Sequence, residues 1–171
     1  MNWIRTILDG FAMAAYFNLF ASAVALYNPR LMFPCYPPAI IKDAPEPPTK
    51  AENRFYGRWI CFGELLPLLF YGAVSMAASD TQGFWQMALT GYIQWMIVNL
   101  CDLFFLDVFL IQKKAKRRFV IPGTEGHPGY GFKAWMKSYA LPEHLLQWPL
   151  ILCPLMAAAQ SGLGLLFGIM I

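Results

Sequence analysis

Residues 84–118 read FWQMALTGYIQWMIVNLCDLFFLDVFLIQKKAKRR, a long apolar stretch that ends in a basic run. A helix needs about 20 mostly apolar residues to cross the hydrocarbon core of a bilayer. The apolar part, from about residue 84 to 112, exceeds that length, so it is long enough to tilt or to project beyond the membrane. This stretch alone predicts a membrane-spanning helix that ends at a membrane surface.

The composition of the chain agrees with a membrane protein. Of its 171 residues, 58% are hydrophobic and only 13% are charged, against about 45–50% apolar and about 25% charged in soluble domains. The many apolar residues exclude a disordered chain, and the scarcity of charge disfavours a soluble globule. A net charge of +3 gives no indication of nucleic-acid binding. The length permits one domain, residues 1–171.

Three further segments have the length and composition of membrane spans. They cover about residues 7–26, 59–78 and 145–170. Glu64 interrupts the second, while the fourth starts between Lys137 and residue 145, and Pro149 and Pro154 are expected to kink it or to mark its true start. With residues 84–112, these segments predict an all-α fold, an integral membrane four-helix bundle.

The connections between the spans differ in character. Residues 28–57 contain seven prolines, and because proline lacks an N–H donor and clashes with the preceding turn, we expect an extended, polyproline-like segment there. Residues 79–83 predict a tight turn between antiparallel spans. Residues 113–136 form a basic and then glycine-rich segment.

The distribution of positive charge predicts the orientation. Twelve of the thirteen Lys and Arg residues lie in residues 28–58 and 113–137, and only Arg5 lies elsewhere. Since cytoplasmic loops carry an excess of basic residues, both long connections are expected in the cytoplasm, with an N-out/C-out topology. A competing interpretation is that Arg5, the apolar stretch after it and Ala21-Ser22-Ala23 form a cleavable signal peptide, which would leave three spans.

Polar residues inside the spans are the strongest indication of function, because they are costly there and often functional. Asp102 lies eleven residues before Lys113, roughly 16 Å from the basic boundary. At about 100° per residue, Asn99, Asp102 and Asp107 share one broad helix face, which should point into the bundle.

These residues, with polar residues of two other spans, predict a cluster in the cytoplasmic half that binds a solute or a proton. His144 and Gln147 share a helix face only if Pro149 does not end the turn before it. The alternative is structural: hydrogen bonds between helices, and ion pairs with Arg58 or Lys113. The candidate residues are Glu64, Asn99, Asp102, Asp107, His144 and Gln147.

The basic run that follows the third span is typical of contact with anionic lipids. Each basic residue near a membrane surface contributes about 1 kcal/mol to such contact. The expected partners are therefore membrane lipids, and no nucleic acid is expected because no aromatic surface accompanies the charges. The residues are Lys113, Lys114, Lys116, Arg117 and Arg118.

The loop of residues 119–131 contains four glycines and two prolines, which predicts a tightly shaped loop. Thr124, Glu125, His127 and Tyr130 supply a hydroxyl, a carboxylate, an imidazole and a phenol. Shaped loops often carry function. Equally, this loop can be an ordered turn that Thr124 and Glu125 cap locally.

Cysteine and glycine spacings give two further expectations. No two cysteines have C-x-x-C spacing and no histidine lies at ligand spacing from one, so no metal site is predicted. Gly164 and Gly168 form a G-x-x-x-G pattern, which lets helices approach closely. That contact lies either within the bundle or at a homodimer or partner interface.

Several motifs together resemble a family of small bacterial multi-span membrane proteins with no assigned activity. The resemblance covers most of the chain and implies a four-helix design in a bacterial inner membrane, with no mechanism. The motifs are Asn28-Pro29-Arg30, Tyr36-Pro37, Asn99 with Asp102 and Asp107, and Ile121-Pro122-Gly123-Thr124-Glu125.

A shorter string, His127-Pro128-Gly129-Tyr130, resembles membrane methyltransferases of the isoprenylcysteine carboxyl and phospholipid type. The resemblance implies S-adenosylmethionine as a cofactor. The match departs from that pattern, since Gly126 replaces the usual arginine, Gly131 comes one place early, and only Glu143 stands for the downstream acidic pair.

The sequence thus predicts a polytopic protein whose buried polar cluster binds or moves a small solute or proton. Two alternatives remain open. One is a membrane-bound enzyme that acts at the cytoplasmic face, in which the loop and His144 supply the chemical groups. The other is an accessory subunit that packs through its G-x-x-x-G face. No catalytic residue is assigned.

Overall fold

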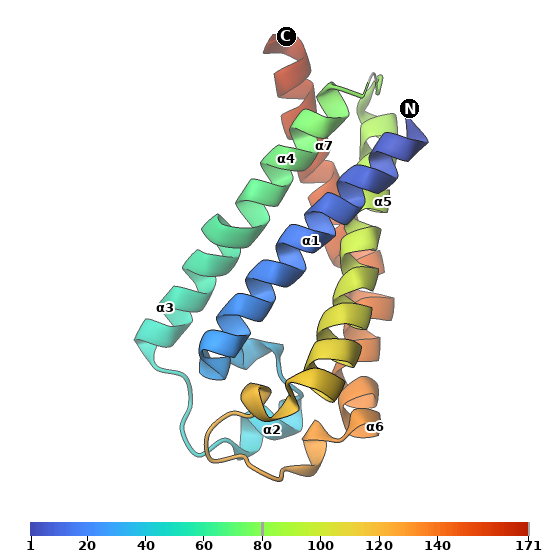
Figure 1. The fold of residues 1–171 in the computed structure, drawn as a ribbon. Coiled ribbons are helices and arrows are strands. Elements are labelled where there is room, and N and C mark those ends of the chain that lie inside the picture. Colours follow the sequence, from blue (N-terminus) through green and yellow to red (C-terminus); the bar gives the residue numbers. More distant parts are fainter. Residues whose placement is uncertain (80, 171) are drawn as a thin grey trace.

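The computed structural model describes residues 1–79 and 81–170, and four long helices dominate it (Figure 1). Each is long and apolar enough to cross a membrane, and they pack together as a bundle, which confirms the predicted all-α four-helix fold. The four helical runs are Trp3–Tyr27, Lys50–Ala77, Phe84–Lys114 and Phe132–Gly168.

The long runs are composed of shorter elements. The first span is α1 (Trp3–Tyr27). The second comprises α3 (Lys50–Arg58), η2 (Trp59–Leu65) and α4 (Leu66–Ala77). The third comprises α5 (Phe84–Cys101) and η3 (Asp102–Lys114). The fourth comprises α6 (Phe132–Trp135), η6 (Met136–Ala140), η7 (Glu143–Leu152) and α7 (Cys153–Met170).

Both termini lie at one end of the bundle, together with the connection between the second and third spans (Figure 1). Of that predicted tight turn, Asp80 lies outside the described residues. The connections of residues 28–49 and 115–131 lie at the opposite end, which we call the basic end. Both termini therefore lie at the same end of the bundle, as the sequence predicts for four spans. Which end faces the cytoplasm stays a prediction.

The proline-rich connection is not the extended segment that was expected. It forms the short helices η1 (Pro29–Cys35) and α2 (Pro38–Asp43). Pro29 and Pro38 occupy first-turn positions, where a helix has no use for an N–H donor. The segment also folds inward, because its apolar side chains Leu31, Met32, Phe33, Tyr36 and Ile40 are buried.

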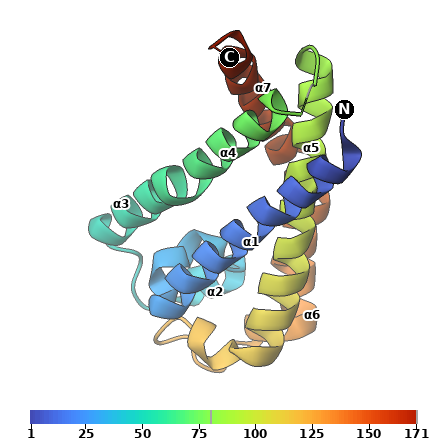
Figure 2. The same cartoon turned by 45° about the horizontal axis from the view of Figure 1, so that its top comes forward.

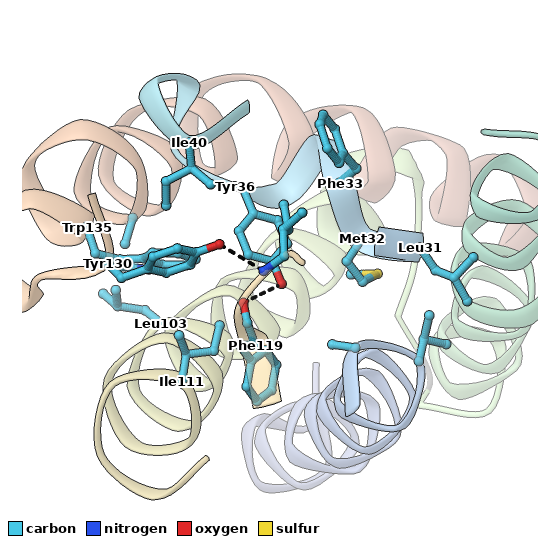
Figure 3. Close-up of a cluster of buried hydrophobic side chains, with 14 residues drawn as sticks. Leu31, Met32, Phe33, Tyr36, Ile40, Leu103, Ile111, Phe119, Tyr130 and Trp135 are labelled. Carbon is cyan, nitrogen blue, oxygen red and sulfur yellow. Dashed lines mark hydrogen bonds between the residues drawn. The ribbon is translucent and has the colours of Figure 1, made fainter. Parts of the chain in front are cut away.

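This connection and the loop of residues 115–131 close the basic end together. The loop contains η4 (Lys116–Phe119) and η5 (Pro128–Tyr130). Figure 3 shows Tyr36 beside the rings of Tyr130 and Trp135, with its hydroxyl donating to the Phe119 carbonyl oxygen at 2.9 Å. Arg30 fixes the same region from outside, since its guanidinium binds both carboxylate oxygens of Glu52 at 2.7 and 3.1 Å. Two segments distant in sequence thereby form one cap.

The fourth span begins at Phe132, well before residue 145, and the second begins at Lys50 rather than near residue 59. Pro149 and Pro154 neither end nor start the fourth helix, which instead widens into π-helical turns around Pro149. Thr49 and Glu52 form a capping box that starts α3, and such a box satisfies the free N–H groups of a first turn. Helix therefore extends further toward the basic end than hydropathy predicts.

The two glycines of the G-x-x-x-G pattern lie in different surroundings. Gly164 is buried, and a Cβ there would contact Ala73, Met76 and Met87 of the neighbouring spans. A Cβ on Gly168 would meet no described atom within 4 Å. The close approach at Gly164 is thus internal to the bundle, and contact with another chain at Gly168 stays a prediction.

The second and fourth spans cross near the end that carries the termini and separate toward the basic end. At the end with the termini, α4 packs on α7. Toward the basic end, the second span contacts other elements instead, because α3 packs on η1 and η2 packs on α1. In Figures 1 and 2, α3 and α6 lie on opposite sides of the basic end. The space between the two spans at this end belongs to the site described next.

Candidate functional site

Three of the four spans change from α-helical to π-helical turns at the same depth. These turns are η2, η3 and, in the fourth span, η6 and η7. A π-helix hydrogen bonds from residue i to i+5, is rare, and is frequent at functional sites. In η3 this pairing brings Asp102 and Asp107, five residues apart, above one another. The wider turns therefore gather polar side chains on the inner side of the bundle.

Proline creates the contact that anchors the centre of the site. In the π-turn of η7, the amide that would reach the carbonyl oxygen of His144 belongs to Pro149, which has no N–H. Asn99 Nδ2 of the third span donates to that carbonyl instead, at 2.9 Å. The pairing fixes the amide of Asn99, so its Oδ1 faces the ring Nδ1 of His144 at 2.7 Å.

The hydrogen bonds of His144 assign its protons. Because an amide oxygen only accepts, Nδ1 must carry a proton and donate it to Asn99. On the other edge of the ring, Nε2 lies 2.9 Å from Asp107 Oδ2. That contact needs one more proton, on the nitrogen or on the oxygen, since two lone pairs repel each other. His144 and Asp107 therefore share a single proton between them.

Asp107 is also held from its second oxygen. Trp135 Nε1 donates to Asp107 Oδ1 at 2.8 Å. The side chain of Asp107 is 5% exposed and that of His144 is 1% exposed. Asp102 Oδ2 lies 3.8 Å from His144 Nε2, beyond hydrogen-bond distance. The imidazole is thus fixed by two partners, with a second carboxyl group beside it.

Asp102 and Asp107 of this group line a cavity of about 310 Å³ at the basic end of the bundle, and His144 adjoins it through its contact with Asp107. Its walls are mostly apolar and aromatic, and all four spans contribute to them. Glu64 and Asp102 both line the cavity, and their atoms Oε1 and Oδ1 are buried without a hydrogen-bond partner among the described residues. Buried polar atoms are nearly always paired, with protein or with ordered water, so these two oxygens indicate a place for a water or a polar ligand.

The structure thus brings five of the six predicted residues to one site, and it leaves out Gln147. Asn99, Asp107 and His144 are in direct contact, and Asp102 and Glu64 lie beside them on the cavity. Gln147 is exposed on the outer side of η7. In a π-helix the residue that shares the face of His144 is four or five places along the chain rather than three, and Trp148 occupies that position.

The four loop candidates act within the cap. Tyr130 accepts from the amide of Ile121 at 3.0 Å and pairs with the Thr124 hydroxyl at 2.8 Å. Glu125 accepts from the amide of Gly123 at 3.1 Å, and His127 contacts Asp43 of α2 at 3.1 Å. These contacts give each side chain a place in the fold of the loop and leave open whether the loop binds a ligand.

Replacing Tyr130 with phenylalanine should lower the free energy of unfolding by about 1–3 kcal/mol, because the buried amide of Ile121 loses its partner and the Thr124 hydroxyl keeps only the Ile121 carbonyl oxygen. Thermal or denaturant unfolding in detergent micelles measures this effect. Asp43→Asn is the control, since the Asp43 side chain is 59% exposed and exposed ion pairs contribute at most about 1 kcal/mol. Equal effects of the two variants would show that the buried bonds do not hold the loop.

The five basic residues after the third span line a surface groove at the basic end. Lys113, Lys114, Lys116, Arg117 and Arg118 surround it together with Leu26 and Leu110. Their side chains are exposed. A row of cations above apolar residues at a span end has the chemistry of an anionic-lipid contact.

Sequence reasoning missed a second polar network, nearer the end that carries the termini. Gln160 Nε2 donates to Gln94 Oε1 at 2.7 Å, and Trp95 Nε1 donates to Gln160 Oε1 at 2.9 Å. Gln94 in turn donates to Ser75 at 3.4 Å. All four are buried. The signal was available, since two glutamines inside predicted spans require partners in the bundle interior.

Sequence reasoning also left out Trp135, Tyr139 and Glu143 as parts of the site, although the prediction of a possible early start of the fourth helix pointed to this region. All three line the cavity, because the fourth helix begins at Phe132.

Compared with known protein families, curated proteins and solved structures, the chain matches none. The two family resemblances drawn from its motifs therefore stay predictions.

Proposed function

We propose that this multi-pass membrane protein binds a small solute in the cavity and exchanges a proton with it through His144 and Asp107. The observation that carries the proposal is the single proton shared by His144 Nε2 and Asp107 Oδ2, 2.9 Å apart beside the cavity. A proton in such a contact can move between ring and carboxyl group with little rearrangement, because Asn99 and Trp135 hold both partners.

The unpaired oxygens favour ligand binding over a purely structural role. A network that only joins helices satisfies its members, as Asn99, His144 and Asp107 do. Glu64 and Asp102 instead keep buried oxygens without a partner among the described residues. A solute that donates hydrogen bonds would satisfy both. Asp102, 3.8 Å from the ring, would then connect the solute to the proton of the His144–Asp107 pair.

A small solute retained by the purified protein tests the proposal. Native mass spectrometry of the wild type in lipid nanodiscs should detect it. Ala21→Phe should remove it, because Ala21 is buried and lines the cavity. Ala23→Phe is the matched control on the same helix, since Ala23 is exposed, and it should retain the solute. A molecule retained equally by both variants, or by none of the three proteins, would contradict the proposal.

The orientation and location belong to the same proposal. The basic end faces the cytoplasm of a bacterial cell in its inner membrane, and the groove of Lys113 to Arg118 contacts anionic lipid headgroups. Supporting this are the concentration of basic residues at one end of the bundle and the cytoplasmic preference of such residues.

Thiol labelling with a membrane-impermeant maleimide checks the orientation. Cysteine in place of Gln82 should be labelled in intact cells, and cysteine in place of Lys116 only after permeabilisation. The native Cys35 should stay unlabelled in both cases, because burial raises the pKa of its thiol to about 12 and only the thiolate reacts. The wild type gives the background. The reverse labelling pattern would overturn the orientation.

A further inference from the structure

We infer the chemical class and the entry route of the solute: an amphiphile with an ammonium head and an apolar tail, which enters from the bilayer between the second and fourth spans. This inference rests on the proposed function, because it assumes that the cavity binds a solute. It adds which solute fits the walls and on which side the cavity opens.

The cavity presents acids and no bases to a bound head group. Four carboxyl groups line it, those of Glu64, Asp102, Asp107 and Glu143, and no Lys or Arg lines it among the described residues. Two buried oxygens, Glu64 Oε1 and Asp102 Oδ1, have no hydrogen-bond partner among the described residues. An ammonium group offers up to three N–H donors and a positive charge, and hydrogen bonds between charged groups are the strong ones. An anionic head would face these carboxyl groups with one unpartnered donor to bind among the described residues, the indole N–H of Trp148.

Aromatic rings complete the surroundings of a cationic head. The cavity is lined by Tyr36, Tyr56, Trp135, Tyr139 and Trp148. A cation within about 6 Å of such a ring face is attracted by its quadrupole, and more strongly where water is excluded. The same rings offer little to a neutral alcohol beyond their apolar surface. The walls therefore discriminate by charge as well as by shape.

The remaining walls suit an apolar tail. They consist of alkyl and ring side chains from each span, with Phe17 and Ala25 of α1, Leu106 of η3 and Met156 of α7 among them. Burial of an alkyl chain against such walls contributes about 0.8 kcal/mol per CH₂ group. A molecule with both a cationic and an apolar part uses the whole cavity.

The exposure of the lining residues shows where the cavity opens. Lining residues of the first span are buried, whereas partly exposed ones lie almost all on the second and fourth spans. They are Tyr56, Ile60 and Leu65 on the second span, and Tyr139, Glu143, Leu152 and Met156 on the fourth. These are the two spans that separate toward the basic end (Figures 1 and 2). At the depth of Leu65 and Leu152, the surroundings of a membrane span are hydrocarbon.

The aqueous route at the basic end is closed. Met32, Tyr36, Phe119 and Trp135 line the cavity on that side and are all buried. Figure 3 shows these side chains packed together in the cap, where the Tyr36 hydroxyl bonds the Phe119 carbonyl. A solute from the water would have to open this cap, whereas a solute dissolved in the bilayer meets the separated spans directly.

Binding of three probes with the same ten-carbon tail tests the head group. Radiolabelled decylamine, decanol and decanoate are added to the wild type in nanodiscs of zwitterionic lipid, and empty nanodiscs give the partition background. We expect saturable binding of decylamine, which is protonated at neutral pH, and binding of the other two at least about tenfold weaker. Equal or tighter binding of decanol or decanoate would overturn the ammonium assignment.

Four variants locate the binding. Glu64→Gln and Asp102→Asn should each weaken decylamine binding about tenfold or more, because a buried charge contact is lost. Ala21→Phe should abolish it, and Ala23→Phe should leave it unchanged. If decylamine binding is unchanged in Glu64→Gln and Asp102→Asn, the ammonium inference is overturned. If Ala21→Phe still abolishes binding in that case, the proposal that the cavity binds a solute stands. If the protein retains a native solute but binds none of the three probes, the ammonium inference is overturned and the proposed solute binding is not.

A bulky residue at the opening tests the entry route. Leu152→Trp narrows the space between the second and fourth spans without removing a polar group of the site. We expect the association and dissociation rates of decylamine both to fall severalfold, with a nearly unchanged equilibrium constant. Arg30→Gln, which removes the ion pair with Glu52 that holds the cap from outside, is the matched comparison and should leave both rates unchanged. Rates that respond to Arg30→Gln and not to Leu152→Trp would place the entry at the aqueous side.

Discussion

Asp107→Ala is expected to destabilise the protein by about 3–5 kcal/mol, the usual cost of removing one partner of a buried polar pair. Two buried groups depend on this carboxyl group, the indole N–H of Trp135 at 2.8 Å and Nε2 of His144 at 2.9 Å. Alanine leaves both buried groups without a partner. Thermal unfolding of the purified protein in detergent micelles measures the loss.

Asp102→Ala is the matched control on the same helix face. Asp102 is also buried, yet its closest approach to His144 is 3.8 Å and its Oδ1 has no partner among the described residues. Removing it therefore breaks no good hydrogen bond and should leave stability unchanged or raise it. A loss of stability in Asp102→Ala as large as that in Asp107→Ala would contradict this distinction. Asp107 would then not differ from Asp102 as the residue whose hydrogen bonds stabilise the site, with Asp102 free to bind a ligand.

That distinction could not be drawn from the sequence. The four spans and the group of deep polar residues follow from hydropathy and from the cost of polar groups in a membrane. However, α-helical angles place Asp102 and Asp107 on opposite sides of Asn99, and depth in the membrane favours Asp102 as the stronger candidate. The π-helical turns of η3 bring them above one another, and periodicity in the sequence gives no sign of such turns.

The role of Pro149 was also misjudged from local rules. Proline as a helix breaker predicts a kink or a helix end near this residue. In the structure its missing N–H leaves the carbonyl oxygen of His144 free, and Asn99 fills the gap from another span. The effect of the proline thus depends on a residue 50 positions earlier in the chain. Only tertiary structure reveals that pairing, and the same holds for the buried side chains of the proline-rich cap.

Asp107→Asn should keep the fold and abolish proton exchange at the site. Asparagine has the shape of aspartate, so its Oδ1 can still accept from Trp135 and its Nδ2 can donate to Nε2 of His144. Both neighbours remain satisfied, and we expect stability within about 1 kcal/mol of the wild type, since no buried group loses a partner. The shared proton is replaced by an amide hydrogen that cannot leave. The ring is then held neutral, with its proton on Nδ1.

Nuclear magnetic resonance of isotope-labelled histidine measures this loss directly. The chain has two histidines, and His127→Gln leaves His144 as the only signal. Glutamine also has an acceptor for the Gly129 amide that His127 caps, and the other contact of His127 is with the largely exposed Asp43. In that background, the Nε2 signal of His144 should be that of a nitrogen that shares a proton when Asp107 is present, and that of an unprotonated nitrogen in Asp107→Asn. An Nε2 signal left unchanged by Asp107→Asn would mean that the proton is not shared with Asp107, and the proposed proton exchange would fail. A changed signal in a protein that still unfolds like the wild type separates the chemistry of the pair from its structural role, which Asp107→Ala alone cannot do.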